Sequence, residues 1–308
     1  STQAIAALSL SFMIFFLIIG FGYGFSSAIT ALLGNALGKK RYKLASIYAH
    51  KGLIFVPLIG LTLSIIGYFF APSLFMFLGA KDEYLQISLD YINPILFGAI
   101  FFMFNFSLNS ILIATGDTKT YRNSLIFGFF ANLALNPLFM YGFLFVPAMG
   151  IKGIAFATVL IQIINMFYLF YKVLQTKLIH FDKLEYFIPN LRIYKLFFTH
   201  GIPSSLNMLT MAIGSLILTY FVSHYGIQAV AGYGIGYRVE QLMLLPALGL
   251  STAVLALVSN NFGAKKYDRV IETLKVSLKY GFIIATVGII FLTILGRLII
   301  SLFDSNPI

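Results

Sequence analysis

The chain repeats itself at one constant offset of 225 residues. Without any gap, residues 3–7 align to 228–232, and residues 24–28 align to 249–253. The same offset pairs further polar and small residues: Asn35 with Asn260, Gly38 with Gly263 and Tyr42 with Tyr267. A single offset that holds through apolar sequence indicates two copies of one membrane-embedded unit, which is the building plan of secondary transporters.

Composition excludes a soluble fold. Hydrophobic residues make up 59% of the chain and charged residues only 10%, whereas a soluble domain carries about 25% charged residues. A membrane-spanning helix needs about 20 apolar residues, and uncharged runs of that size recur at 1–38, 52–80, 91–116, 123–151, 153–171, 196–237, 241–264 and 280–296. The sequence therefore predicts an all-α, polytopic membrane protein.

Charge in the loops predicts the topology. Apolar runs and the breakers between them predict eight helices, at 4–36, 44–70, 84–115, 120–142, 150–174, 197–223, 229–262 and 267–295. Every second connecting segment is basic, as at 38–43, and the segments between carry little or no positive charge, as at 142–149. Because Lys and Arg mark the cytoplasmic side, we expect a multi-pass protein of the inner (plasma) membrane with its basic loops in the cytoplasm.

The offset also predicts how the two copies are oriented. Six predicted helices begin between Ala4 and Gln228, so one repeat unit is six helices and both copies have the same orientation in the membrane. We therefore expect two parallel, pseudo-symmetric six-helix bundles that are incomplete at both ends of this chain. The predicted division is a first lobe at 1–174, a polar cytoplasmic linker at 175–195, and a second lobe at 196–308.

Several other function classes are excluded. The net charge of +11 comes from basic residues in short segments between apolar runs, which argues against nucleic-acid binding. The chain has no cysteine, and its four histidines, at 50, 180, 200 and 224, form no metal-ligand pattern. No paired carboxylates or Ser/His/acid set is present, so we expect no enzyme and no cofactor. We expect a monomer surrounded by membrane lipid.

Six segments together resemble one known family. They are Ile113-Ala114-Thr115-Gly116-Asp117-Thr118-Lys119, residues 132–139, residues 150–158, Tyr237-Arg238-Val239-Glu240-Gln241, residues 245–251 and residues 261–266. In this order they resemble the multidrug and toxic compound extrusion (MATE) family across nearly the whole chain. The resemblance implies a secondary antiporter that exports amphiphilic, often cationic compounds in exchange for Na⁺ or H⁺, by alternating access of a cavity between two six-helix lobes.

Four polar residues form a candidate ion-binding site in the first lobe: Asn109, Asn132, Asn136 and Thr158. Asn132 and Asn136 are four residues apart, hence on one helix face, and oxygen ligands suit a hard cation such as Na⁺. The resemblance places the family's cation site at these positions, but the family commonly has Asp where this chain has Asn136. Since Asn cannot titrate, proton coupling through Asn136 is excluded. The alternative is that these side chains only join neighbouring helices.

The second half has its own candidates. Arg238 and Glu240 lie inside an apolar helix, where a charge costs about 2.5–3.5 kcal/mol, and their repeat partners are Met13 and Phe15. Glu240 is therefore a candidate for ion coupling or for binding a cationic substrate, and Arg238 for restraining it; a structural ion pair is the alternative. Further candidate substrate contacts, with helix packing as their alternative, are Tyr233, Tyr237 and Asn207.

Two other functions stay open. A flippase for lipid-linked oligosaccharides shares this kind of fold, and it would need a strongly cationic cavity, for which Arg238 is the visible candidate. A membrane scaffold or channel is the second alternative, against which the duplicated halves and the polar residues at mid-membrane argue.

Overall fold

The structure is a computed structural model that describes residues 2–77, 80–143, 146–225 and 227–301. Within these residues it consists almost entirely of α-helix, as predicted: α1 (Thr2–Gly38), α2 (Tyr42–Phe77), α3 (Asp82–Ala114), α4 (Lys119–Tyr141), α5 (Ile151–Gln175), α6 (Leu191–Ser223), α7 (Ile227–Gly263) and α8 (Tyr267–Ser301). A short 3₁₀ turn, η1 (Leu184–Tyr186), lies between α5 and α6.

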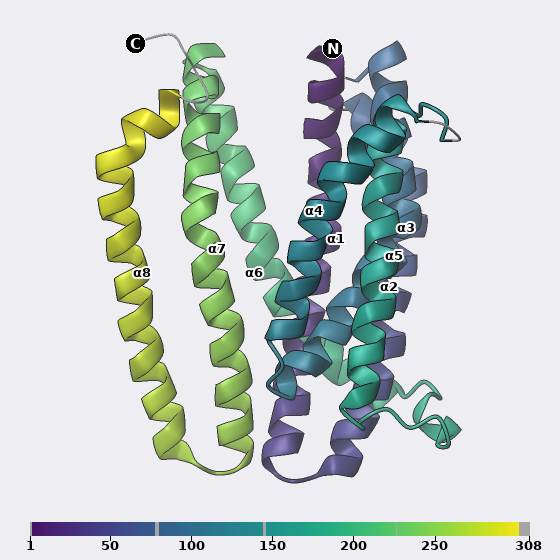
Figure 1. The fold of residues 1–308 in the computed structure, drawn as a ribbon, viewed down its shortest axis with the longest axis vertical. Helices are drawn as coiled ribbons and strands as arrows, with labels where there is room; N and C mark the ends of the chain where they lie inside the picture. The colour runs from purple at the N-terminus through teal and green to yellow at the C-terminus, as the bar shows by residue number, and fades with distance from the viewer. Residues whose placement is uncertain (1, 78–79, 144–145, 226, 302–308) are drawn as a thin grey trace.

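The helices form two groups with α6 between them (Figure 1). Helices α1 to α5 pack together, α7 packs on α8, and α6 contacts both α1 and α7. The beginning of α6 belongs to the core of the first group, because Phe197 is fully buried against Phe55 of α2. We refer to α1–α5 as the first helix group and to α7–α8 as the second helix group.

Several helices are long and apolar enough to cross a membrane. Among the described residues these are α2, α3, α4 and α5 in full, α1 from Ile14 and α8 as far as Ile294. Large apolar side chains stand exposed on their outer faces, including Phe69 and Phe97. In a bilayer such faces meet lipid tails, so the exposure agrees with the predicted membrane protein.

The ends of α2 and α8 and the start of α6 differ from the prediction, and α8 continues to Ser301. Helix α2 continues through Pro72 to Phe77, since packing against α3 compensates for the backbone bond that a proline removes. Helix α6 begins at Leu191, inside the segment predicted as linker. The Asn190 side-chain oxygen accepts hydrogen bonds from the backbone N–H groups of Arg192 and Ile193, at 3.0 and 3.2 Å, and so starts the helix earlier.

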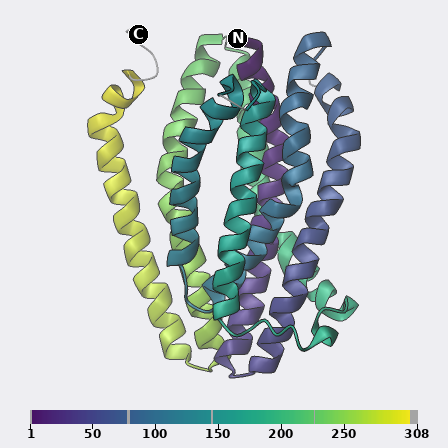
Figure 2. The same cartoon turned by 45° about the vertical axis from the view of Figure 1, so that its right-hand side comes forward.

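Helices α1 and α7 run in the same direction and cross where the α1–α2 and α7–α8 loops lie (Figures 1 and 2). A β-carbon on Gly38 would overlap the carbonyl oxygen of Asn260, and one on Gly263 would overlap that of Asn35. These residues are repeat partners at the offset of 225, so each half makes the same contact with the other. The reciprocity is that of a two-fold axis. We call this contact the α1–α7 crossing.

Candidate functional site

A cavity of about 630 Å³ lies between the first helix group and α7. The two repeated segments meet there, since α1 contributes Ser26 and Ser27 and α7 contributes Gly249, Thr252 and Ala253. Helices α3 and α4 complete its lining, with Phe106, Asn109, Ile113, Tyr121, Arg122, Leu125 and Ile126 among others. The constant offset found in the sequence therefore brings equivalent parts of both halves to one cavity.

The cavity is mainly apolar, with hydroxyl groups, one amide and one cation. Among the described lining residues, Arg122 is the charged one. Its guanidinium donates to the Asn123 side-chain oxygen, with Nη2 and Nε at 3.0 and 3.3 Å. Sequence analysis missed Arg122, because a basic residue at the start of a helix is typical of a cytoplasmic loop.

Two of the four predicted ion ligands have buried oxygens with no hydrogen-bond partner among the described residues. Asn109 of α3 is 7% exposed and lines the cavity, and its Oδ1 has no partner. Asn136 of α4 likewise has a buried Oδ1 without a partner. Leaving a buried acceptor without a hydrogen bond costs about 1–3 kcal/mol. Binding a cation or a water molecule at either oxygen would recover that free energy.

The other two predicted ligands are bonded within their own helices. Asn132 Nδ2 donates to the Gly128 carbonyl at 3.0 Å, which leaves its oxygen as an acceptor. Thr158 Oγ1 donates to the Ile154 carbonyl at 3.0 Å. The helices that carry them adjoin, since both α3 and α4 pack on α5. Within the described part of the chain, no hydrogen bond joins any of the four residues to another.

Sequence analysis also missed a polar pair beside this site. Asn105, one turn before Asn109 on α3, is 3% exposed, and its Nδ2 donates to the Gln162 carbonyl and side-chain oxygens at 3.0 and 2.7 Å. The four-residue spacing of Asn105 and Asn109 was the available signal. This pair ties α3 to α5 and fixes the position of Asn109.

The second-half candidates are only partly described. Asn207 lies exposed on α6, and Tyr233 is half-buried on α7. Helix α7 also contains Tyr237, Arg238 and Glu240, but their side chains lie outside the described residues.

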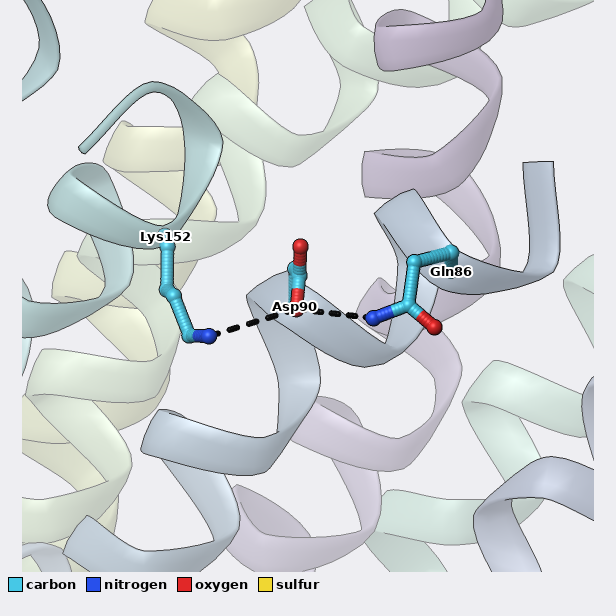
Figure 3. Close-up of polar contacts among 3 residues, drawn as sticks. All are labelled: Gln86, Asp90 and Lys152. Carbon is cyan, nitrogen blue, oxygen red and sulfur yellow. Dashed lines mark hydrogen bonds and ion pairs between the residues drawn. The ribbon is translucent and has the colours of Figure 1, made fainter. Parts of the chain in front are cut away.

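One ion pair joins α3 to α5 (Figure 3). Lys152 Nζ lies 3.4 Å from Asp90 Oδ1, and Gln86 Nε2 donates to the same oxygen at 3.2 Å. The two charged side chains are 49% and 38% exposed, and exposed pairs contribute about 0–1 kcal/mol. We interpret this pair as a contact between helices and not as part of the cavity.

The turn between α3 and α4 is the segment 113–119 that resembled a family motif. Asp117 Oδ1 accepts from the backbone N–H groups of Lys119 and Thr120, each at 3.0 Å, and Oδ2 accepts from the Thr120 hydroxyl. Burial acts to raise the pKa of Asp117, but these hydrogen bonds and the Lys172 charge hold that pKa below its ordinary value of 3.8. The carboxylate therefore stays ionised and caps α4 beside the cavity.

Comparison with known proteins gives a consistent result. The MatE family model matches residues 1–138 and 203–308. The Bacillus subtilis protein named "Probable multidrug resistance protein YoeA" is 33% identical over 305 residues, covering 98% of this chain and 66% of that protein. The FAD transporter of Shewanella oneidensis is 26% identical over 99% of this chain and 68% of its own length. The Staphylococcus aureus multidrug export protein MepA is 25% identical over 99% of this chain and 66% of its own length.

Solved structures share the fold. A multidrug resistance MATE family transporter of the MOP superfamily, in an outward-facing conformation, superposes with a TM-score of 0.86 at 24% identity, over 99% of this chain and 68% of that one. A MOP superfamily transporter from Pyrococcus furiosus, described as having a binding pocket of reverse polarity, superposes with a TM-score of 0.90 at 26% identity. The match covers 99% of this chain and 67% of that one. This chain thus spans about two thirds of the length of its relatives, for example 66% of YoeA.

These findings confirm the predicted two-lobe helical fold, and the relatives described above are named as multidrug resistance, multidrug export or transporter proteins. The family model covers well over half of the chain. The chain belongs to the MatE family.

Proposed function

We propose that the protein is a secondary antiporter that exports amphiphilic compounds by alternating access. One observation carries the proposal: repeat-related segments of α1 and α7 line a common cavity, and the α1–α7 crossing closes the molecule at one end. Glycine at these positions lets the two backbones approach closely, and the contact opens when a ligand has the higher affinity for the opposite state.

The proposal includes an orientation and a division into lobes. The crossing lies with the basic α1–α2 and α7–α8 loops, and under the positive-inside rule their charge supports a cytoplasmic position for it in the plasma membrane. The division is a first lobe at 1–174, a linker at 175–195 and a second lobe at 196–308, and the two lobes would separate at the crossing when the cavity opens on that side. The protein acts as a monomer in lipid and needs no cofactor.

Coupling to Na⁺ or H⁺ is assigned to two places. The first, for Na⁺, is the polar cluster of Asn109, Asn132, Asn136 and Thr158, supported by the two unpartnered buried oxygens. The second is Glu240, the carboxylate inside apolar α7. Substrate contacts are assigned to Arg238, Tyr233, Tyr237, Asn207 and Glu240.

Efflux from proteoliposomes tests this proposal. The full-length protein is reconstituted, and export of a fluorescent dye is measured under an imposed Na⁺ or pH gradient. Loss of gradient-driven export in Glu240→Gln, with export kept in Asn136→Ala, supports coupling in the second half; the opposite result moves coupling to the asparagine cluster. No gradient-driven export of any dye by the wild type would reject the antiporter.

A second candidate is an exporter of anionic amphiphiles, favoured by Arg122 as the charged residue in the described cavity lining. The relative named FAD transporter is consistent with it. Competition between ethidium, a cation, and a flavin nucleotide, an anion, separates the two substrate classes. Arg122→Gln should weaken export of the flavin nucleotide and leave export of ethidium unchanged. Arg41→Gln in the α1–α2 loop should change export of neither compound.

A further inference from the structure

The segment that connects α5 to α6 is folded onto α2 and is not a loose tether. Ser46 Oγ donates to the Leu178 carbonyl at 2.6 Å. His50 is fully buried, and its Nε2 accepts from the His180 backbone N–H at 3.1 Å. Nδ1 lies 2.7 Å from the Ser46 carbonyl, which can only accept, so Nδ1 donates to it within α2. His50 of α2 thus contacts the connection through Nε2, which lies beside the His180 backbone.

A buried lysine holds the next part of the connection. Lys51 is 4% exposed, and its Nζ donates to the carbonyl oxygens of Glu185, at 3.4 Å, and Ile188. The His50 ring also meets the edges of the Tyr186 and Phe187 rings, at centroid distances of 5.5 and 4.7 Å. These contacts give η1 and its flanking residues one defined position, at the lower right of Figure 1.

A cavity of about 560 Å³ lies between this folded connection and the start of α2. We call it the linker pocket. Its lining contains three lysines, Lys43, Lys177 and Lys183, together with Tyr42, Ser46, His180 and Tyr186 among others. One carboxylate, Glu185, lies in the described lining, and the buried Lys51 ammonium attracts that carboxylate.

The described lining of the linker pocket therefore carries a net positive charge, with three exposed lysines and one carboxylate. Among the described residues, none of the three lysines forms an ion pair, and Lys183 Nζ instead lies 5.6 Å from the centre of the Tyr186 ring. The first turn of the long helix α2, at Tyr42 and Lys43, borders the same space. A helix N-terminus favours an anion, and lysine binds phosphate as a point charge.

We propose that the linker pocket binds a phosphoryl group. It lies at the end of the molecule that holds the basic loops (Figure 1), where the headgroup of an anionic phospholipid or a small soluble phosphate can reach it. Both sources present the same chemistry, and the experiment separates them.

The test is a binding titration of the full-length protein in neutral detergent, read by native mass spectrometry. The probes are short-chain phosphatidylglycerol, short-chain phosphatidylcholine and glycerol phosphate. We expect saturable binding of phosphatidylglycerol over phosphatidylcholine. The combined variant Lys43→Gln, Lys177→Gln, Lys183→Gln should lose about a hundredfold in affinity, since each lysine near anionic lipid contributes about fivefold. Competition by glycerol phosphate at similar concentration identifies a soluble ligand; its failure to compete identifies the lipid.

A matched control removes the same charge elsewhere. Lys265, Lys266 and Lys275 are exposed at the α7–α8 end and lie outside the linker pocket, so Lys265→Gln, Lys266→Gln, Lys275→Gln should bind phosphatidylglycerol like the wild type. Equal loss in both combined variants would mean attraction by net charge alone and would overturn the proposal. Equal binding of phosphatidylglycerol and phosphatidylcholine by the wild type, without glycerol phosphate binding, would overturn it too.

Discussion

At the scale of single residues, two asparagines one turn apart on α3 differ in their surroundings. Among the described residues both side-chain oxygens are buried without a partner, but Asn105 Nδ2 donates to Gln162. Leucine has the same branching at Cγ as asparagine, with larger methyl groups in place of the two polar atoms. We expect Asn105→Leu to lower the free energy of unfolding by about 1–3 kcal/mol, because the Gln162 oxygen loses its donor. Asn109→Leu should leave that free energy unchanged or raise it, because an unsatisfied oxygen is removed. Thermal unfolding of both variants in detergent measures the difference.

The same pair separates an ion ligand from a structural residue. If Asn109 is a ligand, Asn109→Leu abolishes gradient-driven export although the protein is as stable as the wild type. Normal export by a stable Asn109→Leu protein would instead mean that the oxygen is a packing defect.

Asp117 gives a prediction about pH. Its pKa is below the ordinary value in the folded state, so its stabilisation is complete above about pH 4 and is lost as the pH falls through the folded-state value. The free energy of unfolding of Asp117→Ala should therefore be about 1 kcal/mol below that of the wild type at pH 7. This difference should become smaller below about pH 4. The unfolding midpoint measured from pH 7 to pH 3 checks this. Asp268→Ala, at the exposed start of α8, is the control and should lower the free energy of unfolding at pH 7 by less than Asp117→Ala does.

At the scale of elements, the α1–α7 crossing depends on glycine. A side chain at Gly38 would meet the Asn260 backbone, and overpacking costs about 1–3 kcal/mol. We expect Gly38→Val to shift the equilibrium toward the state with the crossing open, by about tenfold for each 1.4 kcal/mol. Spin labels in the α1–α2 and α7–α8 loops measure the distance change. Gly281→Val on α8, where the nearest side chain is 3.8 Å away, is the control, and an equal shift there would refute a specific contact.

The helices themselves were predictable because each one is marked locally. Uncharged runs predicted all eight helices, since the bilayer imposes a minimum apolar length. Boundaries were less predictable where tertiary contacts decide them. Helix α2 passes through Pro72 because it is packed against α3, and α6 starts early because Asn190 caps it.

The candidate site was predictable only in part. Asn109 and Asn136 stood out because an amide in an apolar helix needs a partner, and the structure leaves both oxygens without one. Arg122 and Lys51 could not be singled out, because basic residues at helix ends look alike in a sequence. Their roles depend on α7 and on the folded connection, which are distant in the chain.

At the scale of the whole molecule, the repeat explains the arrangement better than any single motif does. One offset predicted that equivalent residues would occur in two parallel units, and in the structure repeat partners face each other at the crossing and line one cavity. Because the contact is reciprocal, opening it would separate equivalent residues of both halves. This geometry makes the crossing the natural place to test alternating access.

A reversible bridge across the crossing provides that test. A β-carbon on Gly34 would lie 3.2 Å from Cβ of Ser259, near the distance of about 3.5–4.5 Å found in disulfides, and the sequence has no cysteine to compete. We expect the variant Gly34→Cys, Ser259→Cys to lose most dye export on oxidation and to regain it on reduction, while each single variant exports under both conditions. Because the bridge holds α1 against α7, export that continued with the bridge fully formed would show that the crossing does not open during transport.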